Sequence, residues 1–157
     1  MNTQQYISKI STIFYAIVGG PLMLFAIIYL RFKSERGGLI ESLPEDITPV
    51  WHILLPFATL LAIIAAYVYY QRLKKQISPA EDREVKLKKF YQASLIKYGL
   101  LAVASLIMIA CLYGTTEKIF AAGYAIVLVV FSLNRPTPYR IKKDGKLSEE
   151  ELNALYE

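Results

Sequence analysis

The chain has 157 residues, of which 55% are hydrophobic and 20% are charged, and its formal net charge at pH 7 is +5. This length suits one domain, and a single cysteine excludes a disulfide framework and a cysteine-based metal site. The charged residues lie almost entirely between long apolar runs, which is typical of a membrane protein and excludes a soluble bundle with one charged face per helix. Because the basic residues flank these runs, they indicate lipid headgroups and not nucleic acid as the partner.

Four apolar segments are predicted to cross the bilayer as helices, at residues 10–30, 50–70, 93–114 and 117–134. A helix needs about 20 apolar residues to cross the roughly 30 Å hydrocarbon core of a bilayer. We therefore expect an all-α integral membrane protein. Residues 1–134 would form a four-helix transmembrane bundle, and residues 135–157 a cytoplasmic tail that is basic and contains prolines.

The first segment contains Gly19, Gly20 and Pro21 near its middle. A proline inside a helix removes a backbone hydrogen bond and clashes with the preceding turn, so we expect a kink. The simpler interpretation is a packing kink with close helix approach, and the alternative is a hinge or a binding notch. The segment is too long for a signal-peptide core, and basic residues follow it, so we expect it to be retained.

Small residues recur every four positions on all four segments, and such stripes let helices approach closely in lipid. We expect them to pack inside the bundle, with contact to a partner helix as the alternative. The stripes are Ala16 and Gly20; Ala58, Ala62 and Ala66; Ala110 and Gly114; and Ala121 and Ala125.

His52 lies beside Trp51 at the start of the second segment. Aromatic residues mark membrane interfaces, so we expect His52 to be an interfacial polar residue, with a proton relay or ligand as the alternative. Because the chain has one histidine, a haem with two histidine ligands from the same chain is excluded. No cofactor or metal is expected.

Ser78, Pro79 and Glu81 have the pattern of a capping box and predict that a helix begins at Pro79. No Gly or Pro follows until Gly99, so this helix would run unbroken into the third segment as a cytoplasmic extension. Its charged first turns would be exposed or would dock another subunit. Lys97 lies just inside the third segment. We expect its side chain to extend to the headgroups, and binding to a lipid phosphate or a neighbouring carboxylate is the alternative.

The tail follows the fourth segment with two closely spaced prolines, which predict an extended path from residue 134 to residue 140. Residues 142–146 are interpreted as a basic turn. Ser148 and Glu151 then predict a capping box for a short terminal helix. Arg135 and Arg140 are candidates for contact with lipid headgroups.

The N-terminal residues, the middle loop and the tail together contain 13 lysines and arginines, against four on the opposite side, which predicts that both termini lie in the cytoplasm. We expect the cell membrane, of the bacterial inner-membrane type, as the location. No catalytic or phosphate-binding motif is recognisable. The leading hypothesis is a non-enzymatic accessory or assembly subunit, which contacts the bilayer and either another membrane protein or further copies of itself. The alternatives are a small oligomeric transporter or channel with Lys97 selecting anions, and a membrane enzyme that acts on lipid headgroups.

Overall fold

The computed structural model describes residues 3–34, 48–115 and 118–153, with side chains for residues 8–31, 52–114 and 118–151. Every regular element in these ranges is a helix, so the all-α prediction is confirmed. The helices are α1 (Thr3–Ser34), α2 (Thr48–Lys75), α3 (Arg83–Thr115), α4 (Lys118–Leu133), α5 (Pro138–Gly145) and α6 (Glu149–Asn153).

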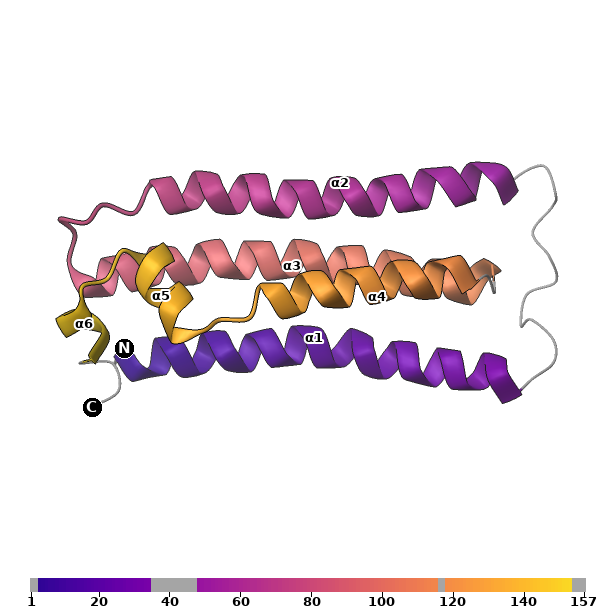
Figure 1. Cartoon of the computed structure of the whole chain (residues 1–157), viewed down its shortest axis with the longest axis horizontal. Helices are drawn as coiled ribbons and strands as arrows, with labels where there is room; N and C mark the ends of the chain where they lie inside the picture. Colours follow the sequence, from indigo (N-terminus) through magenta and orange to yellow (C-terminus); the bar gives the residue numbers. More distant parts are fainter. Residues whose placement is uncertain (1–2, 35–47, 116–117, 154–157) are drawn as a thin grey trace.

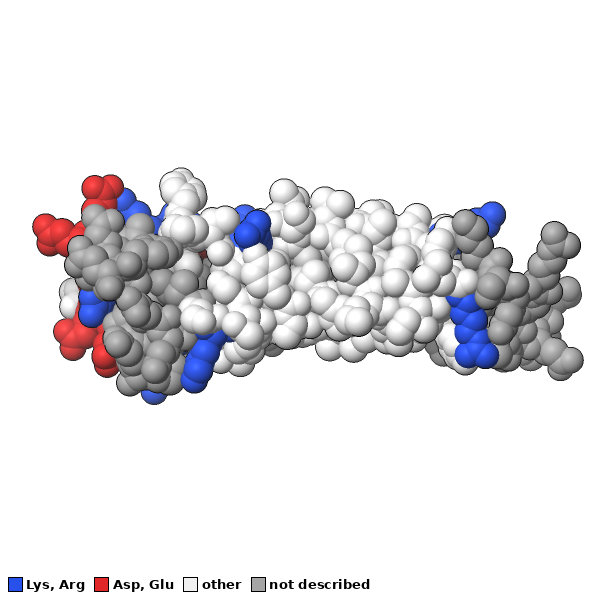
Figure 2. All heavy atoms as spheres, turned by 90° about the horizontal axis from the view of Figure 1, so that it is seen from below, with Lys and Arg blue, Asp and Glu red and all other residues white. Residues whose placement is uncertain are grey.

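The long helices lie side by side, with α3 as the central helix (Figure 1). In its most apolar stretch, 50% of α3 is buried, against 17% for α2 and 6% for α1. Helices α5 and α6 lie at the end where α1 begins and α2 ends, which is called the tail end below. On the face drawn in Figure 2, charged side chains lie at both ends of the molecule, and the band between them is largely uncharged. Many large apolar side chains are exposed along the helices that form this band, which is called the apolar band below.

Three of the described helices, α1, α2 and α3, are long and apolar enough to cross a membrane. Helix α4 has 16 residues, a length of about 24 Å at 1.5 Å per residue. It passes the same test only together with α5, from which it is separated by a bend of 74°. The number of candidate spans is therefore three, or four if the bent pair counts as one.

Aromatic rings join α1 to α3 and α4 inside the apolar band. Phe14 packs edge-on against Tyr98 and Phe131, with ring centroids 5.1 and 6.4 Å apart. Phe25 stacks on Tyr124 with centroids 4.3 Å apart. Such pairs stabilise a core by about 0.5–1.5 kcal/mol beyond the area they bury.

The glycines differ in what surrounds them. A Cβ added to Gly123 of α4 would lie 2.8 Å from the Sδ atom of Met108 in α3, so these two helices approach closely there. A Cβ added to Gly19, Gly20 or Gly114 would meet nothing within 4 Å. The predicted close approach at Gly20 is therefore wrong within this chain.

Three alanines of the small-residue stripes also lie on the surface, and one is buried. Ala66 is fully buried, whereas Ala16, Ala110 and Ala125 are exposed. Helix α1 continues through Pro21 from Thr3 to Ser34, curving gently without a break.

The third helix begins at Arg83, about one turn later than predicted. Residues 78–81 form a turn: the Ser78 carbonyl accepts a hydrogen bond from the Glu81 amide, and Ser78 Oγ accepts one from the Ala80 amide at 3.4 Å. The Glu81 carboxylate accepts a hydrogen bond from Lys89 at 2.5 Å and also interacts with the Ser78 backbone amide, as the predicted capping box requires. These contacts stabilise the turn that precedes the helix and not the first turn of the helix itself. The first helical bond runs from the Lys86 amide to the Asp82 carbonyl at 3.1 Å.

The predicted exposure of these first turns is wrong for Leu87 and Phe90, whereas Val85 is 42% exposed. Leu87 and Phe90 are buried and belong to the same core cluster as Ile141 and Leu147 of the tail. Gly145 lies close to Phe90, and α5 packs on α3. The tail supplies the apolar cover that the local sequence of α3 lacks.

The path of the tail differs from the prediction because Pro138 begins a helix and does not extend the chain. The Thr137 hydroxyl accepts a hydrogen bond from the Arg140 amide, and Pro138 occupies the first turn, where its missing N–H costs nothing. Lys146, with φ of 51°, ends the helix in the left-handed region. Residues 138–145 are therefore α5, and the predicted extended path and basic turn are wrong there.

The capping box of the terminal helix is confirmed. The Ser148 amide donates to Glu151 Oε2 at 2.7 Å, and the Glu151 amide donates to Ser148 Oγ at 3.1 Å. Helix α6 follows at Glu149–Asn153. The side chains of Leu152 and Leu155, predicted to share its apolar face, lie outside the described residues.

Candidate functional site

Polar side chains from three helices and from the α4–α5 connection meet at the tail end, where α5 folds back onto α2 and α3. We call them the polar cluster. Its members are Tyr67, Tyr70 and Lys74 of α2, Lys97 and Tyr98 of α3, Asn134 after α4, and Arg140 and Asp144 of α5.

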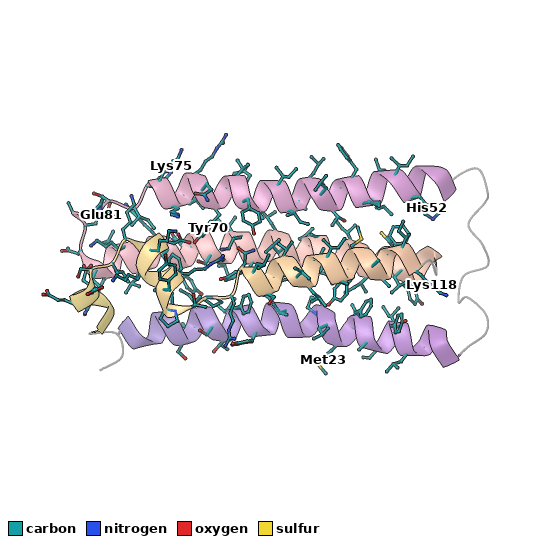
Figure 3. The ribbon with its side chains drawn as sticks, viewed as in Figure 1. Met23, His52, Tyr70, Lys75, Glu81 and Lys118 are labelled. Atoms are coloured by element: carbon teal, nitrogen blue, oxygen red, sulfur yellow. The ribbon has the colours of Figure 1, made fainter. Side chains whose placement is uncertain are left out.

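Asp144 holds α5 against α2. Its carboxylate accepts a hydrogen bond from the Tyr70 hydroxyl at 2.6 Å and one from Lys74 Nζ at 2.5 Å. Figure 3 shows the Tyr70 side chain pointing from α2 toward α3 and α5. Burial raises the pKa of Asp144, but the bonds from Lys74 and Tyr70 more than offset this, so its pKa lies below the ordinary value.

Lys97 of α3 lies beside the ring of Tyr70, next to the contact between Tyr70 and Asp144, and is only 2% exposed. Its Nζ atom is 3.8 Å from the centroid of the Tyr70 ring and 5.1 Å from that of Tyr98. A cation over an aromatic face is stabilised by about 0.5–2 kcal/mol. The expectation that this side chain extends to the headgroups is wrong, because the folded-back tail and Tyr70 cover it.

Asn134 joins α4 to its three neighbours. Its Nδ2 atom donates to the Tyr67 hydroxyl at 2.5 Å and to the Val130 carbonyl at 2.7 Å. Its Oδ1 atom accepts from Arg140 Nη1 at 3.2 Å, and its carbonyl accepts from the Tyr98 hydroxyl at 3.1 Å. These bonds use the amide fully and fix the place where the chain leaves α4.

Ion pairs surround the polar cluster on the side of α6. Lys86 of α3, which is buried, donates to both carboxylate oxygens of Glu151 at 3.1 and 3.2 Å. Lys142 pairs with Glu149 at 2.5 Å, and Lys146 donates to the Ile77 carbonyl at 2.5 Å. Together these contacts tie the tail to the middle loop and to the start of α3.

The structure brings two of the predicted site residues, Lys97 and Arg140, into the same cluster. Arg135 lies next to that cluster, with its guanidinium 5.7 Å from the centroid of the Tyr15 ring. His52 lies at the opposite end of the molecule, where its ring stacks on Phe120 with centroids 5.7 Å apart (Figure 3).

Gly19, Gly20 and Pro21 lie near the middle of α1, away from the polar cluster. The cluster's other members were not predicted. Asp144 is an acid within a basic run, and Asn134 sits between the fourth apolar segment and a proline; neither pattern is specific enough to indicate a site.

Among the described residues, no three His, Cys, Asp or Glu side chains lie close enough together to hold a metal ion. What the polar cluster offers chemically is a set of hydrogen-bond donors and positive charges around one carboxylate. Comparisons with models of protein families, with curated proteins and with solved structures find no match for this chain.

Proposed function

We propose that the chain is an integral membrane protein in which α1, α2, α3 and α4 each cross the bilayer. The observation that carries this proposal is the apolar band between two charged ends (Figure 2). Large apolar side chains stand on the surface of this band, such as Ile53 at 75% exposure and Ile27 and Ile126 at 63%. Soluble monomers rarely expose contiguous apolar patches of more than a few hundred Å², whereas lipid covers such a surface without cost.

In this arrangement the tail end lies in the cytoplasm and the membrane is the cell membrane. The support is the excess of lysine and arginine in the middle loop and in the tail. The described start of α1 and the tail helices lie at the same end of the bundle, as an even number of crossings requires (Figure 1).

We infer that its role is that of a non-enzymatic accessory or assembly subunit. The support is the outward-facing stripe of Ala16 and Gly20 on α1, because a Cβ at Gly20 would meet nothing within 4 Å. Small residues on a lipid-facing surface allow the backbone of another helix to approach closely. The partner is therefore an apolar helix of another membrane protein or of a second copy.

The geometry favours neither alternative role specifically. A channel with Lys97 at its inner mouth requires an accessible amine, but Tyr70 and α5 cover this residue. A headgroup-binding enzyme would use the basic residues of the tail, of which Arg140 bonds to Asn134 and Lys142 pairs with Glu149, whereas Arg135 and Lys143 are exposed.

Native mass spectrometry after extraction in a mild detergent tests the subunit role. We expect masses above that of the 17.8 kDa monomer. Replacing Ala16 and Gly20 together by leucine should remove these higher masses, because the added side chains hold the backbone of the partner helix away. Ala26→Leu, on another exposed face of the same helix, is the matched control and should leave them unchanged. A monomer alone from the unaltered chain would contradict the proposal.

A further inference from the structure

The polar cluster contains more positive than negative charge. Lys74, Lys97 and Arg140 come from three different helices, and Asp144 is the carboxylate among them. Arg140, Asp144 and Lys74 are the charged groups that act electrostatically on Lys97. A site with this composition, largely shielded from water, is electrostatically favourable for a further negative charge.

Lys97 is the cation with the least compensation. Its amine faces the rings of Tyr70 and Tyr98, and among the described residues it has neither a hydrogen-bond acceptor nor an ion-pair partner. A buried ammonium normally keeps an acceptor for its three N–H groups, because burying an unpaired charge is costly. The carboxylate of Asp144 meanwhile accepts hydrogen bonds from Lys74 and Tyr70.

We propose that the polar cluster is a binding site for a phosphate-type oxyanion and that Asp144 is a tethered competitor for it. The Asp144 carboxylate accepts hydrogen bonds from the Tyr70 hydroxyl and the Lys74 amine. Phosphate oxygens accept hydrogen bonds from the same kinds of donor. A phosphate brings more charge and more acceptor atoms than a carboxylate, so it also engages the amine of Lys97. When it binds, Asp144 is displaced and α5 loosens from α2.

The position of the cluster suits the phosphate of a phospholipid. It lies where the apolar band of α2 gives way to Arg72, Lys74 and Lys75, the depth at which headgroups meet a membrane protein. A shallow hollow of about 440 Å³ opens beside it on α2, lined by Tyr67, Val68, Gln71, Arg72 and Lys75. Tyr67 borders both the hollow and the cluster, because its hydroxyl accepts a hydrogen bond from Asn134.

A lipid headgroup and free phosphate share this chemistry, so the experiment separates them. Binding of inorganic phosphate is measured by calorimetry on the full chain in a neutral detergent. Binding of lipid is measured by native mass spectrometry from nanodiscs of phosphatidylcholine with and without phosphatidylglycerol. Only the lipid arm depends on the proposed membrane insertion. If the chain fails to enter nanodiscs, the membrane proposal fails, and the detergent arm still tests the site.

Asp144→Asn removes the competing charge while keeping the shape of the side chain. We expect it to bind the anion at least about tenfold more tightly, a difference of about 1.4 kcal/mol. Lys97→Met should abolish binding, whereas Lys88→Met, an exposed lysine on the same helix, should leave it unchanged.

Binding of phosphate in detergent would identify a soluble oxyanion, and a response to phosphatidylglycerol alone would identify a headgroup. No binding in either arm, or equal or weaker binding by Asp144→Asn, would overturn the proposal. Because loss of a buried lysine can prevent folding, the comparison of Asp144→Asn with the unaltered chain is decisive by itself.

Discussion

The apolar band and the tail end of this molecule are held together by different forces. In the band, aromatic pairs join α1 to α3 and to α4, and Met108 of α3 packs on Gly123 of α4. At the tail end, hydrogen bonds and ion pairs on Asp144, Asn134 and Glu151 join segments far apart in the sequence. The difference implies that shape-changing substitutions affect the band most, and charge-changing substitutions the tail end.

Removing the carboxylate of Asp144 should have the largest effect. Asp144→Ala leaves Tyr70 and Lys74 without their acceptor and removes the nearest negative charge from Lys97. We expect a loss of about 2–4 kcal/mol in the free energy of unfolding, because hydrogen bonds to charged groups contribute about 1.5–3 kcal/mol each. Denaturation in detergent measures this. Lys143→Ala, an exposed neighbour, should change it by less than about 0.5 kcal/mol.

Adding volume at Gly123 should have the next largest effect. Gly123→Leu places side-chain atoms where the buried thioether of Met108 lies, so Met108 has to repack, and overpacking of this kind typically costs about 1–3 kcal/mol. Gly114→Leu is the matched control, because a side chain there meets open space. Equal stability of the two variants, measured by thermal unfolding in the same detergent, would show that the helices do not approach closely at Gly123.

Acid should weaken the tail end before it affects the apolar band. The pKa of Asp144 is lowered from 3.8 and that of Glu151 from 4.5; for Glu151 the chief cause is the hydrogen bond from the Ser148 amide. Because the pKa is lowered in the fold, the ionised carboxylate stabilises the fold at pH values above its ordinary pKa. This stabilisation is lost as the pH falls through the lowered pKa.

The protection of the α5 and α6 amides against hydrogen exchange, measured relative to the intrinsic exchange rate at each pH, should therefore fall below about pH 4, while that of α3 and α4 stays high. In Asp144→Asn, exchange in α5 should be fast already at neutral pH and much less dependent on acid. Simultaneous acceleration in all helices of the unaltered chain would contradict separate stabilisation of the two regions.

The smallest effect should come from the terminal capping box. Ser148→Ala removes the acceptor of the Glu151 amide, and loss of such a cap costs about 1 kcal/mol. Because α6 has five residues at the edge of the tail, we expect local fraying, seen as faster exchange of its amides. Ser148→Asp retains an acceptor and should preserve slow exchange.

The two regions also differ in how well sequence predicts them. The apolar band follows from local signals, namely the length of the apolar runs, and α1, α2, α3 and α4 contain the predicted segments almost throughout. The cap at Ser148 is equally local. The fold-back of the tail is not local, because Tyr70 and Asp144 are 74 residues apart.

The sequence identified Lys97 as a candidate, but the prediction that its side chain extends to the headgroups was wrong because the fold-back of the tail is not a local feature. An ionisable residue within an apolar run is easily recognised, but which residues cover it depends on the position of α5. Helix α5 begins at Pro138, and a proline at this place in the sequence is compatible with a helix start and with an extended chain. The contact between Gly123 and Met108 was not predicted, because Gly123 does not belong to a repeat of small residues four apart.

The contact of Asp144 with Tyr70 and Lys74 locks α5 onto the end of α2. A distance measurement between spin labels at positions 75 and 143, in a chain with Cys111→Ala, tests this lock most directly in nanodiscs of phosphatidylcholine. We expect one narrow distance distribution for the chain with Asp144 and a broad one for Asp144→Asn. A broad distribution in both chains, or a narrow one in both, would contradict it.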